Sequence, residues 1–167
     1  MPLGFVFAVV YLWLAQPNWI SLIAGVAVVA LGLALRAAAA GHVKKDEELT
    51  TTGPYAYTRN PLYLGSLLIA VGFAIASRSL WVALIVIALL AGIYWPVIRS
   101  EEEYLRARFP GFDDYAHRVP RLLPRFSAGP AAGNFSPVLY RKHREYNALI
   151  GALAMIGALI AKIILHL

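Results

Sequence analysis

Long apolar runs are the feature that most limits how this chain can fold. A helix needs about 20 apolar residues to cross the hydrocarbon core of a bilayer. Residues 20–40, 80–98 and 148–165 meet that length or come close to it. Residues 61–76 form a shorter run that can gain length from its flanks, and residues 3–15 are marginal. These runs predict membrane helices joined by short polar breaks.

The predicted fold is all-α, a polytopic membrane helical bundle of about five helices that forms a single domain over residues 1–167. Composition agrees, because 60% of the chain is hydrophobic and only 14% is charged, whereas soluble domains are about half apolar and a quarter charged. A proline inside a helix removes a hydrogen bond and bends it. The expected helices cover residues 3–15, 19–40, 61–76, 79–109 with a kink at Pro96, and 146–166.

Charge gathers on one side of this bundle. Of 15 Lys and Arg residues, all but Arg78 and Lys162 lie in residues 36–59 or 99–144, and the nine acidic residues lie on the same side. The positive-inside rule makes that side cytoplasmic. We therefore expect a multi-pass protein, and the small size of the chain suggests a prokaryotic plasma membrane. The net charge of +6 indicates contact with membrane lipids rather than nucleic acid.

Several kinds of site are excluded or disfavoured. The chain has no cysteine, so disulfides, thiol nucleophiles and cysteine-based zinc sites are ruled out. No His or acidic pair has a ligand-like spacing with a partner elsewhere, so we expect no metal site. Transport is also disfavoured, because no predicted span carries an ionisable residue near its centre.

The first polar block contains the stretch GPYAYTRNPLYLG, residues 53–65. Asn is a favoured helix N-cap and Pro suits the first helical position, so a helix is expected to begin at Asn60-Pro61. Its free N–H groups would suit a carboxylate or phosphate, although simple capping is the favoured explanation for the dipeptide alone. Tyr55, Tyr57 and Tyr63 could contact an adenine or a cation, or act as interfacial anchors.

The second polar block begins with RSEEEYLRARF, residues 99–109. At 1.5 Å per residue, a helix over residues 80–109 is roughly 45 Å long, so it extends beyond a roughly 30 Å hydrocarbon core. Glu102 and Arg106 have the spacing of a surface ion pair. The proline-rich residues 109–126 should lie in the headgroup layer and fold over both polar blocks as a lid, or serve as an interfacial anchor.

Small residues recur at four-residue spacing in the last predicted helix. Gly157 and Ala161 form one such pair, and Ala154 and Ala158 form another. This pattern is typical of close helix packing in membranes. We expect it either within the chain or in a homodimer.

Three motifs together resemble the isoprenylcysteine carboxyl methyltransferase and phospholipid methyltransferase superfamily of membrane enzymes. They are LTTTGPYAYTRNPLYLG, then EEEYLRARF, then YAHRVPR, and the resemblance covers roughly residues 35–124. It implies a small helical bundle that binds S-adenosylmethionine at its cytoplasmic face. The implied reaction is methyl transfer to a lipid-like or isoprenoid-linked acceptor carrying a carboxylate, amine or thiol.

The resemblance also implies which residues bind the cofactor. The residues that match or flank the family's cofactor segment are His42, Glu47, Glu48, Leu49, Thr50, Tyr55, Arg59, Asn60, Pro61, Leu62 and Tyr63. Within this set, the carboxylates of Glu47 or Glu48 would bind ribose hydroxyls or the ammonium group. Relatives commonly have His where this chain has Asn60, and Asn cannot act as a base near neutral pH.

The acidic pair of the family matches Glu101 and Glu102, which are expected to orient the acceptor or take its proton. Some members carry an arginine one turn earlier, where this chain has Val97, and Arg99 would take its place. Two alternatives stay open. Membrane reductases that resemble steroid 5α-reductases and bind NADPH share part of the first motif, but they tend to have Glu at the position of Ser66. A non-enzymatic lipid-binding protein is the other alternative.

Overall fold

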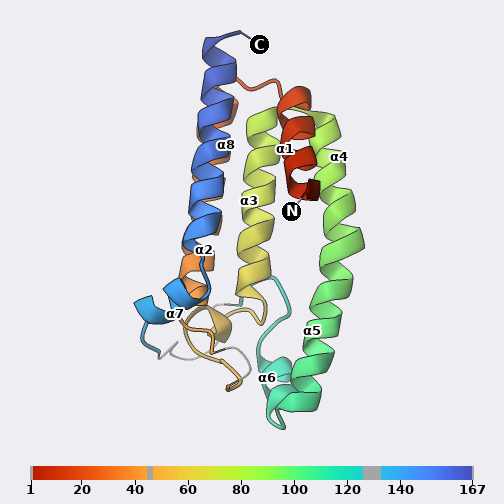
Figure 1. Cartoon of the computed structure of the whole chain (residues 1–167). Coiled ribbons are helices and arrows are strands. Elements are labelled where there is room, and N and C mark those ends of the chain that lie inside the picture. The colour runs from red at the N-terminus through yellow and green to blue at the C-terminus, as the bar shows by residue number, and fades with distance from the viewer. Residues whose placement is uncertain (1, 45–46, 126–132, 167) are drawn as a thin grey trace.

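Helices make up all the regular structure of the described chain, which comprises residues 2–44, 47–125 and 133–166 of a computed structural model (Figure 1). The long elements lie side by side as a bundle, and short helices and loops gather at one end. In chain order the long elements are α1 (Pro2–Leu14), α2 (Trp19–Ala40), α3 (Pro61–Ser77), α4 (Leu80–Leu89), α5 (Trp95–Arg108) and α8 (Tyr146–Ile164). The short ones are a 3₁₀ turn (Gly53–Ala56), α6 (Phe112–Arg118) and α7 (Pro137–Lys142).

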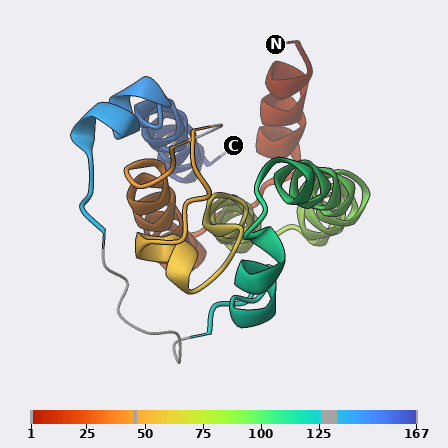
Figure 2. The same cartoon turned by 90° about the horizontal axis from the view of Figure 1, so that it is seen from below.

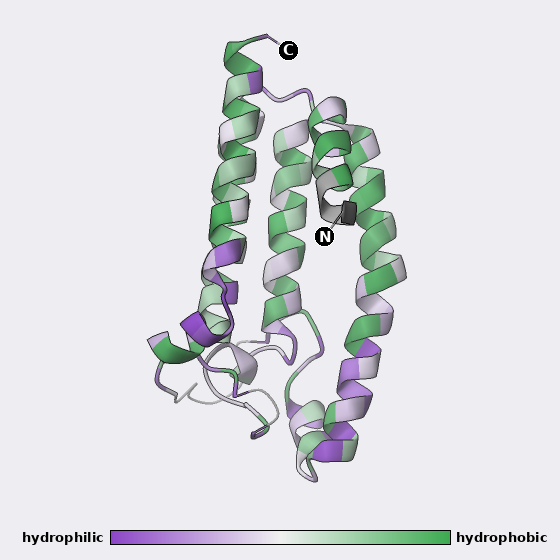
Figure 3. Cartoon of the chain, in the orientation of Figure 1, coloured by the Kyte–Doolittle hydropathy of each residue, from purple (hydrophilic) through white to green (hydrophobic). Residues whose placement is uncertain are grey.

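Three helices are long and apolar enough to cross a membrane by length and composition. They are Trp19–Ala40, the continuous Leu80–Arg108 and Tyr146–Ile164. The expected count of about five is therefore confirmed for three, because α3 has 17 residues and α1 has 13. Apolar residues cover the shafts of the bundle and hydrophilic residues collect at the end that holds α6 and α7 (Figure 3). This end carries both polar blocks.

The α4–α5 helix is interrupted just before Pro96. Residues Leu90–Tyr94 form a π-helical turn, in which the Trp95 N–H reaches the carbonyl of Leu90. Pro96 has no N–H to donate to the preceding turn, so the regular hydrogen-bond ladder cannot continue through it. The interruption falls where the kink was expected, and α5 then carries the second polar block away from the apolar region.

Glycine allows α2 and α3 to pack with their backbones in contact. A Cβ on Gly25 would lie 2.4 Å from the Gly72 carbonyl oxygen, and a Cβ on Gly32 would lie 2.6 Å from that of Gly65. Real Cβ atoms do not approach so closely, so no larger residue fits without moving the helices apart. The two helices lie next to each other when the bundle is viewed along its axis (Figure 2). Together they form the rigid pair on which the polar end is built.

The small residues of α8 pack differently from those of α2 and α3. A Cβ on Gly157 would meet no atom within 4 Å, and Ala154 and Ala161 are exposed. The close packing predicted for α8 is therefore absent from the described part of this chain, and packing in a homodimer stays a prediction. Instead α8 buries Ala152 and Leu159 against the bundle.

Replacing Gly25 by Ala should destabilise the protein, because the new methyl group collides with the α3 backbone. Overpacking of this kind costs about 1–3 kcal/mol. The matched variant Gly157→Ala should leave stability unchanged or raise it, since its methyl group meets open space and Ala favours helix. The measurement is the thermal unfolding midpoint of each purified variant in one detergent. Equal midpoints for the two variants would contradict the α2–α3 contact.

Candidate functional site

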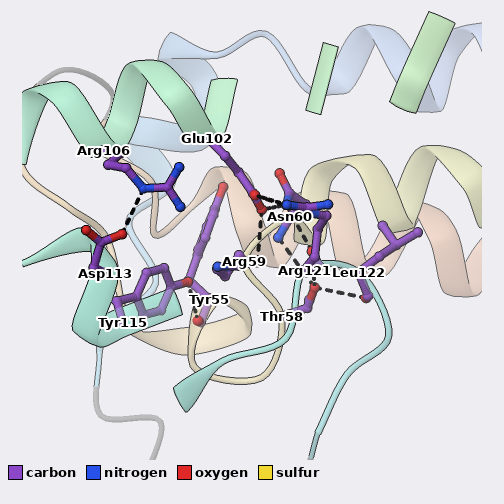
Figure 4. Close-up of polar contacts among 10 residues, drawn as sticks. All are labelled: Tyr55, Thr58, Arg59, Asn60, Glu102, Arg106, Asp113, Tyr115, Arg121 and Leu122. Atoms are coloured by element: carbon purple, nitrogen blue, oxygen red, sulfur yellow. Dashed lines mark hydrogen bonds and ion pairs between the residues drawn. The ribbon is translucent and has the colours of Figure 1, made fainter. Parts of the chain in front are cut away.

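A buried carboxylate, Glu102 on α5, joins three segments of the chain (Figure 4). Its side chain is almost inaccessible, with the residue 3% exposed. Its Oε1 lies 3.3 Å from the guanidinium Nη2 of Arg59 and accepts a hydrogen bond of 3.3 Å from the side-chain amide of Asn60. Its Oε2 accepts bonds of 2.9 and 2.8 Å from the Nε and Nη2 of Arg121. All three predicted motif regions therefore meet at this carboxylate or directly beside it.

The start of α3 is where Asn60-Pro61 predicted it, but Asn60 does not cap the helix through its side chain. The amide nitrogen of Asn60 instead donates to Glu102 and, at 2.9 Å, to the Arg121 carbonyl oxygen. The predicted N-cap position of Asn60 is therefore confirmed, whereas the expected capping bond from its side chain is not formed. A hydrogen bond to a buried carboxylate is stronger than one between neutral groups, which favours the observed arrangement.

The segment after α6 covers the start of α3 as a lid. The Arg59 N–H donates to the Pro120 carbonyl oxygen at 2.9 Å, and the Arg125 N–H donates to that of Tyr57 at 3.0 Å. The buried Thr58 hydroxyl donates to the Leu122 carbonyl oxygen at 2.9 Å. Backbone and side-chain bonds thus hold residues 120–125 across the first polar block, as the lid hypothesis expected.

α6 fixes the other side of the block. The Tyr115 hydroxyl donates to the Tyr55 carbonyl oxygen at 2.7 Å. Burial raises the pKa of the Tyr115 hydroxyl, so it stays a proton donor well into the alkaline range. Leu49 packs against the cluster that Tyr115 forms with Phe112 and Val119. Leu49 and Tyr55, both predicted cofactor residues, therefore help to seat α6.

The surface ion pair expected between Glu102 and Arg106 is wrong. Glu102 points into the bundle, where its carboxylate pairs with Arg59 and Arg121. The Nε of Arg106 instead contacts the Asp113 carboxylate at 2.8 Å on the exposed side of α5. Helical spacing allowed the pair, but the lid supplied a better partner for the buried carboxylate.

The predicted cofactor residues before Gly53 do not converge on Glu102. The His42 Nδ1 lies 2.7 Å from the Ala38 carbonyl oxygen, and its ring fills the space beside Gly53, whose positive φ of 58° and missing side chain allow the contact. Three more contacts complete this group: Glu47 pairs with Lys142, Glu48 pairs with Lys44, and the Thr50 hydroxyl accepts from the Lys44 N–H. The two glutamates are exposed.

A second group of predicted residues lies where α3 and α5 face each other. The Tyr63 side chain lies beside the Glu101 carboxylate, close enough for the two groups to interact. The Tyr63 ring meets the Tyr94 ring edge to face, with centroids 5.7 Å apart. Glu101 is partly buried and makes no ion pair within the described residues. It is therefore an anionic group beside two aromatic rings.

Arg36 and Glu145 form a charged pair that no motif predicted. The Arg36 Nε and Nη2 donate to the two Glu145 oxygens at 3.0 and 2.7 Å. The Nη1 of Arg36 donates to the Leu62 carbonyl oxygen at 3.4 Å and to the Ser66 hydroxyl. Arg36 thus ties α2 to α3 and to the start of α8, beside a cavity of about 210 Å³. The only indication of this pair in the sequence was that Arg36 and Glu145 each lie at the edge of an apolar run.

Arg99, predicted to assist the acidic pair, lies elsewhere. It is exposed, and its guanidinium is 5.2 Å from the centroid of the Trp95 ring. The guanidinium of Arg121 is the cation that pairs with Glu102 from that side. The described residues contain no group of three His, Asp or Glu side chains that could hold a metal ion.

Glu102→Gln should lower stability, since two guanidinium groups would lose their buried counter-charge. Breaking such a pair costs about 3 kcal/mol. Glu103→Gln is the matched control, because Glu103 is the next residue, is exposed and forms no ion pair in the described chain. Unfolding midpoints in detergent test this, and a similar loss in both variants would contradict a structural role for Glu102.

Comparison with known proteins agrees with the motif analysis. Residues 20–111 match the phospholipid methyltransferase family. Over 84 residues the chain is 44% identical to the nickel-cobalt-cadmium resistance protein NccN of Alcaligenes xylosoxydans xylosoxydans. Over the same length it is 39% identical to the cobalt-zinc-cadmium resistance protein CzcN of Cupriavidus metallidurans.

Both alignments cover 50% of this chain but only 39% of each relative, so the chain spans about two-fifths of the length of these curated proteins. No solved structure matches the chain. The family match covers more than half of the chain and includes α3, α5 and Glu102 with its partners Arg59 and Asn60. The chain therefore belongs to the phospholipid methyltransferase family.

Proposed function

We propose that this chain is an integral membrane methyltransferase that transfers a methyl group from S-adenosylmethionine to a lipophilic acceptor. The observation that carries the proposal is the meeting of three motif regions around Glu102. Arg59 and Asn60 come from the first motif, Glu102 from the second and Arg121 from the end of the third. An interfacial belt alone would not require a buried carboxylate with three partners from two other segments of the chain.

The donor set suits a cofactor that carries a sulfonium, an ammonium and a carboxylate group. Tyr63 and Tyr94 place two aromatic rings beside the Glu101 carboxylate, an environment that favours a cation. The Nε of Arg59 is a buried donor without an acceptor in the described part of the chain. A carboxylate oxygen of a ligand would satisfy it.

The buried start of α3 is less suited to bind the cofactor. Asn60 and Pro61 are buried, and the lid residues 120–122 lie against them. We therefore assign Asn60 to the support of Glu102, and assign cofactor contact to Tyr63 and its neighbours. Glu47 and Glu48, which are exposed beside lysines, remain proposed contacts for ribose hydroxyls or the ammonium group.

When bound, S-adenosylmethionine supplies an electrophilic methyl group on its sulfonium sulfur. The protein then has to hold the acceptor in line with that group and exclude water. We assign Glu101 to the acceptor: it orients the acceptor head group and takes the proton that an amine or thiol loses. The acceptor's apolar part would remain among the membrane helices.

Cofactor binding is tested by the unfolding midpoint of the purified protein with S-adenosylmethionine, and with NADPH in parallel. A ligand that binds only the folded protein adds about 2.7 kcal/mol at 100 times its Kd. We expect stabilisation by S-adenosylmethionine alone. Stabilisation by NADPH alone would replace the proposal by a reductase, and no effect of either ligand would favour a non-enzymatic lipid-binding protein.

The role of Glu101 is tested by Glu101→Gln, with Glu103→Gln as the control from the same run. Membranes containing each variant receive S-adenosylmethionine labelled in its methyl group, and label in the extracted lipid is counted. Glu101→Gln should fold with an unchanged midpoint and lose at least tenfold in transfer, as expected for removal of an acid–base group. Wild-type transfer in Glu101→Gln would overturn this role.

A further inference from the structure

The side of α5 away from Glu101 carries a second group of functional residues. Arg99 and Glu101 are two positions apart, so at 3.6 residues per turn their side chains leave the helix in nearly opposite directions. Glu101 meets Tyr63, whereas Arg99 lies over Trp95. Whatever binds at Arg99 therefore differs from what binds at Glu101.

Two guanidinium groups from separate segments meet at the Trp95 ring. Arg99 lies one helical turn after Trp95, with its guanidinium carbon 5.2 Å from the ring centroid. Arg121 reaches the same ring from the lid, at 5.3 Å. Its bonds to Glu102 hold Arg121 in place. The Trp95 residue is 44% exposed, so the ring is accessible from outside the bundle.

These cations are not neutralised within the described chain. Arg59 and Arg121 share the single Glu102 carboxylate, and Arg99 forms no ion pair with a described acidic residue. Arg99 and Arg121 bring two positive charges to Trp95, and the Glu102 carboxylate that pairs with Arg121 is shared with Arg59. A guanidinium binds phosphate oxygens through paired N–H donors, and an exposed one retains donors for that purpose.

The position of the group along α5 matches the headgroup layer of a membrane. Residues 80–98 are apolar and Arg99 begins the polar part of the helix, a change that is visible along this helix in Figure 3. Trp is enriched at this boundary, and lipid phosphates lie at the same depth. Leu123, two residues after Arg121, is 77% exposed and adds apolar surface that suits acyl chains.

We propose that Trp95, Arg99 and Arg121 form a docking site for the phosphate group of an anionic phospholipid. The two guanidinium groups bind the phosphate, and the Trp95 ring holds both of them at the level of the headgroups. Arg121 also binds Glu102, so an occupied site adds a contact that keeps the lid closed over the start of α3. This binding does not depend on methyl transfer.

The test compares lipids that share acyl chains and differ in charge. Wild-type protein in a non-ionic detergent receives dioleoyl phosphatidylglycerol, dioleoyl phosphatidylcholine or inorganic phosphate, and native mass spectrometry and the unfolding midpoint report binding. We expect phosphatidylglycerol to bind more tightly than phosphatidylcholine and inorganic phosphate to have no effect. Arg99→Gln should lower the affinity for phosphatidylglycerol about fivefold, the contribution of one basic residue near an anionic surface.

Arg108→Gln is the matched control, because it removes the same charge from an exposed position about 13 Å further along the same helix. It should leave phosphatidylglycerol binding unchanged, and Arg99→Lys should retain part of it. An equal loss in Arg99→Gln and Arg108→Gln would overturn the site in favour of general surface charge. Equal binding of the two lipids, or a stabilisation by inorganic phosphate that matches the lipid, would also overturn it.

Discussion

The polar end of this protein depends on a carboxylate that has been removed from water. An unpaired buried charge would be strongly destabilising, so Glu102 can stay 3% exposed only if its oxygens are fully used. Arg59, Asn60 and Arg121 meet that requirement from two different segments. This requirement fixes the geometry of the site. If the start of α3, the middle of α5 or the lid moved away, the Glu102 carboxylate would be exposed to water or would lose its partners. The positions of the neighbouring groups, including Tyr63 and Glu101, follow from this constraint.

The Glu102 centre also needs a support that does not move, and the α2–α3 pair provides it. Because glycine brings these backbones into contact at two levels, α3 has little freedom to slide or tilt against α2. Arg36 then bonds α2 to Leu62 and Ser66 of α3, and to Glu145 at the start of α8. Packing fixes the apolar part of α3 and charge fixes its polar end. The residues between these two regions, around Tyr63, are those assigned to the cofactor.

Apolar run length predicted the helices well, since a helix must be about as long as the membrane it crosses, and α5 ends one residue before its expected limit. The Asn60-Pro61 dipeptide correctly predicted the start of α3, because a helix accommodates proline without distortion only in its first turn. The partners of the charged side chains were predicted less well. Arg106 had a suitable neighbour four residues away and paired instead with Asp113, and Arg36 met Glu145 across 109 residues. Local spacing cannot reveal partners that tertiary packing brings together.

The three successive glutamates of α5 have different surroundings and therefore different roles. Successive residues on a helix differ by about 100° in direction, so Glu101, Glu102 and Glu103 face three environments: the Tyr63 side chain, the guanidinium groups of Arg59 and Arg121, and solvent. The same geometry directs Arg99 to Trp95, away from Glu101. A negative charge beside aromatic rings on one side of α5 and an excess of positive charge on the other favour different ligands. With the proposed assignments, the helix would keep the methyl acceptor apart from the anionic lipid, while Arg121 and Glu102 connect the two sides through one ion pair.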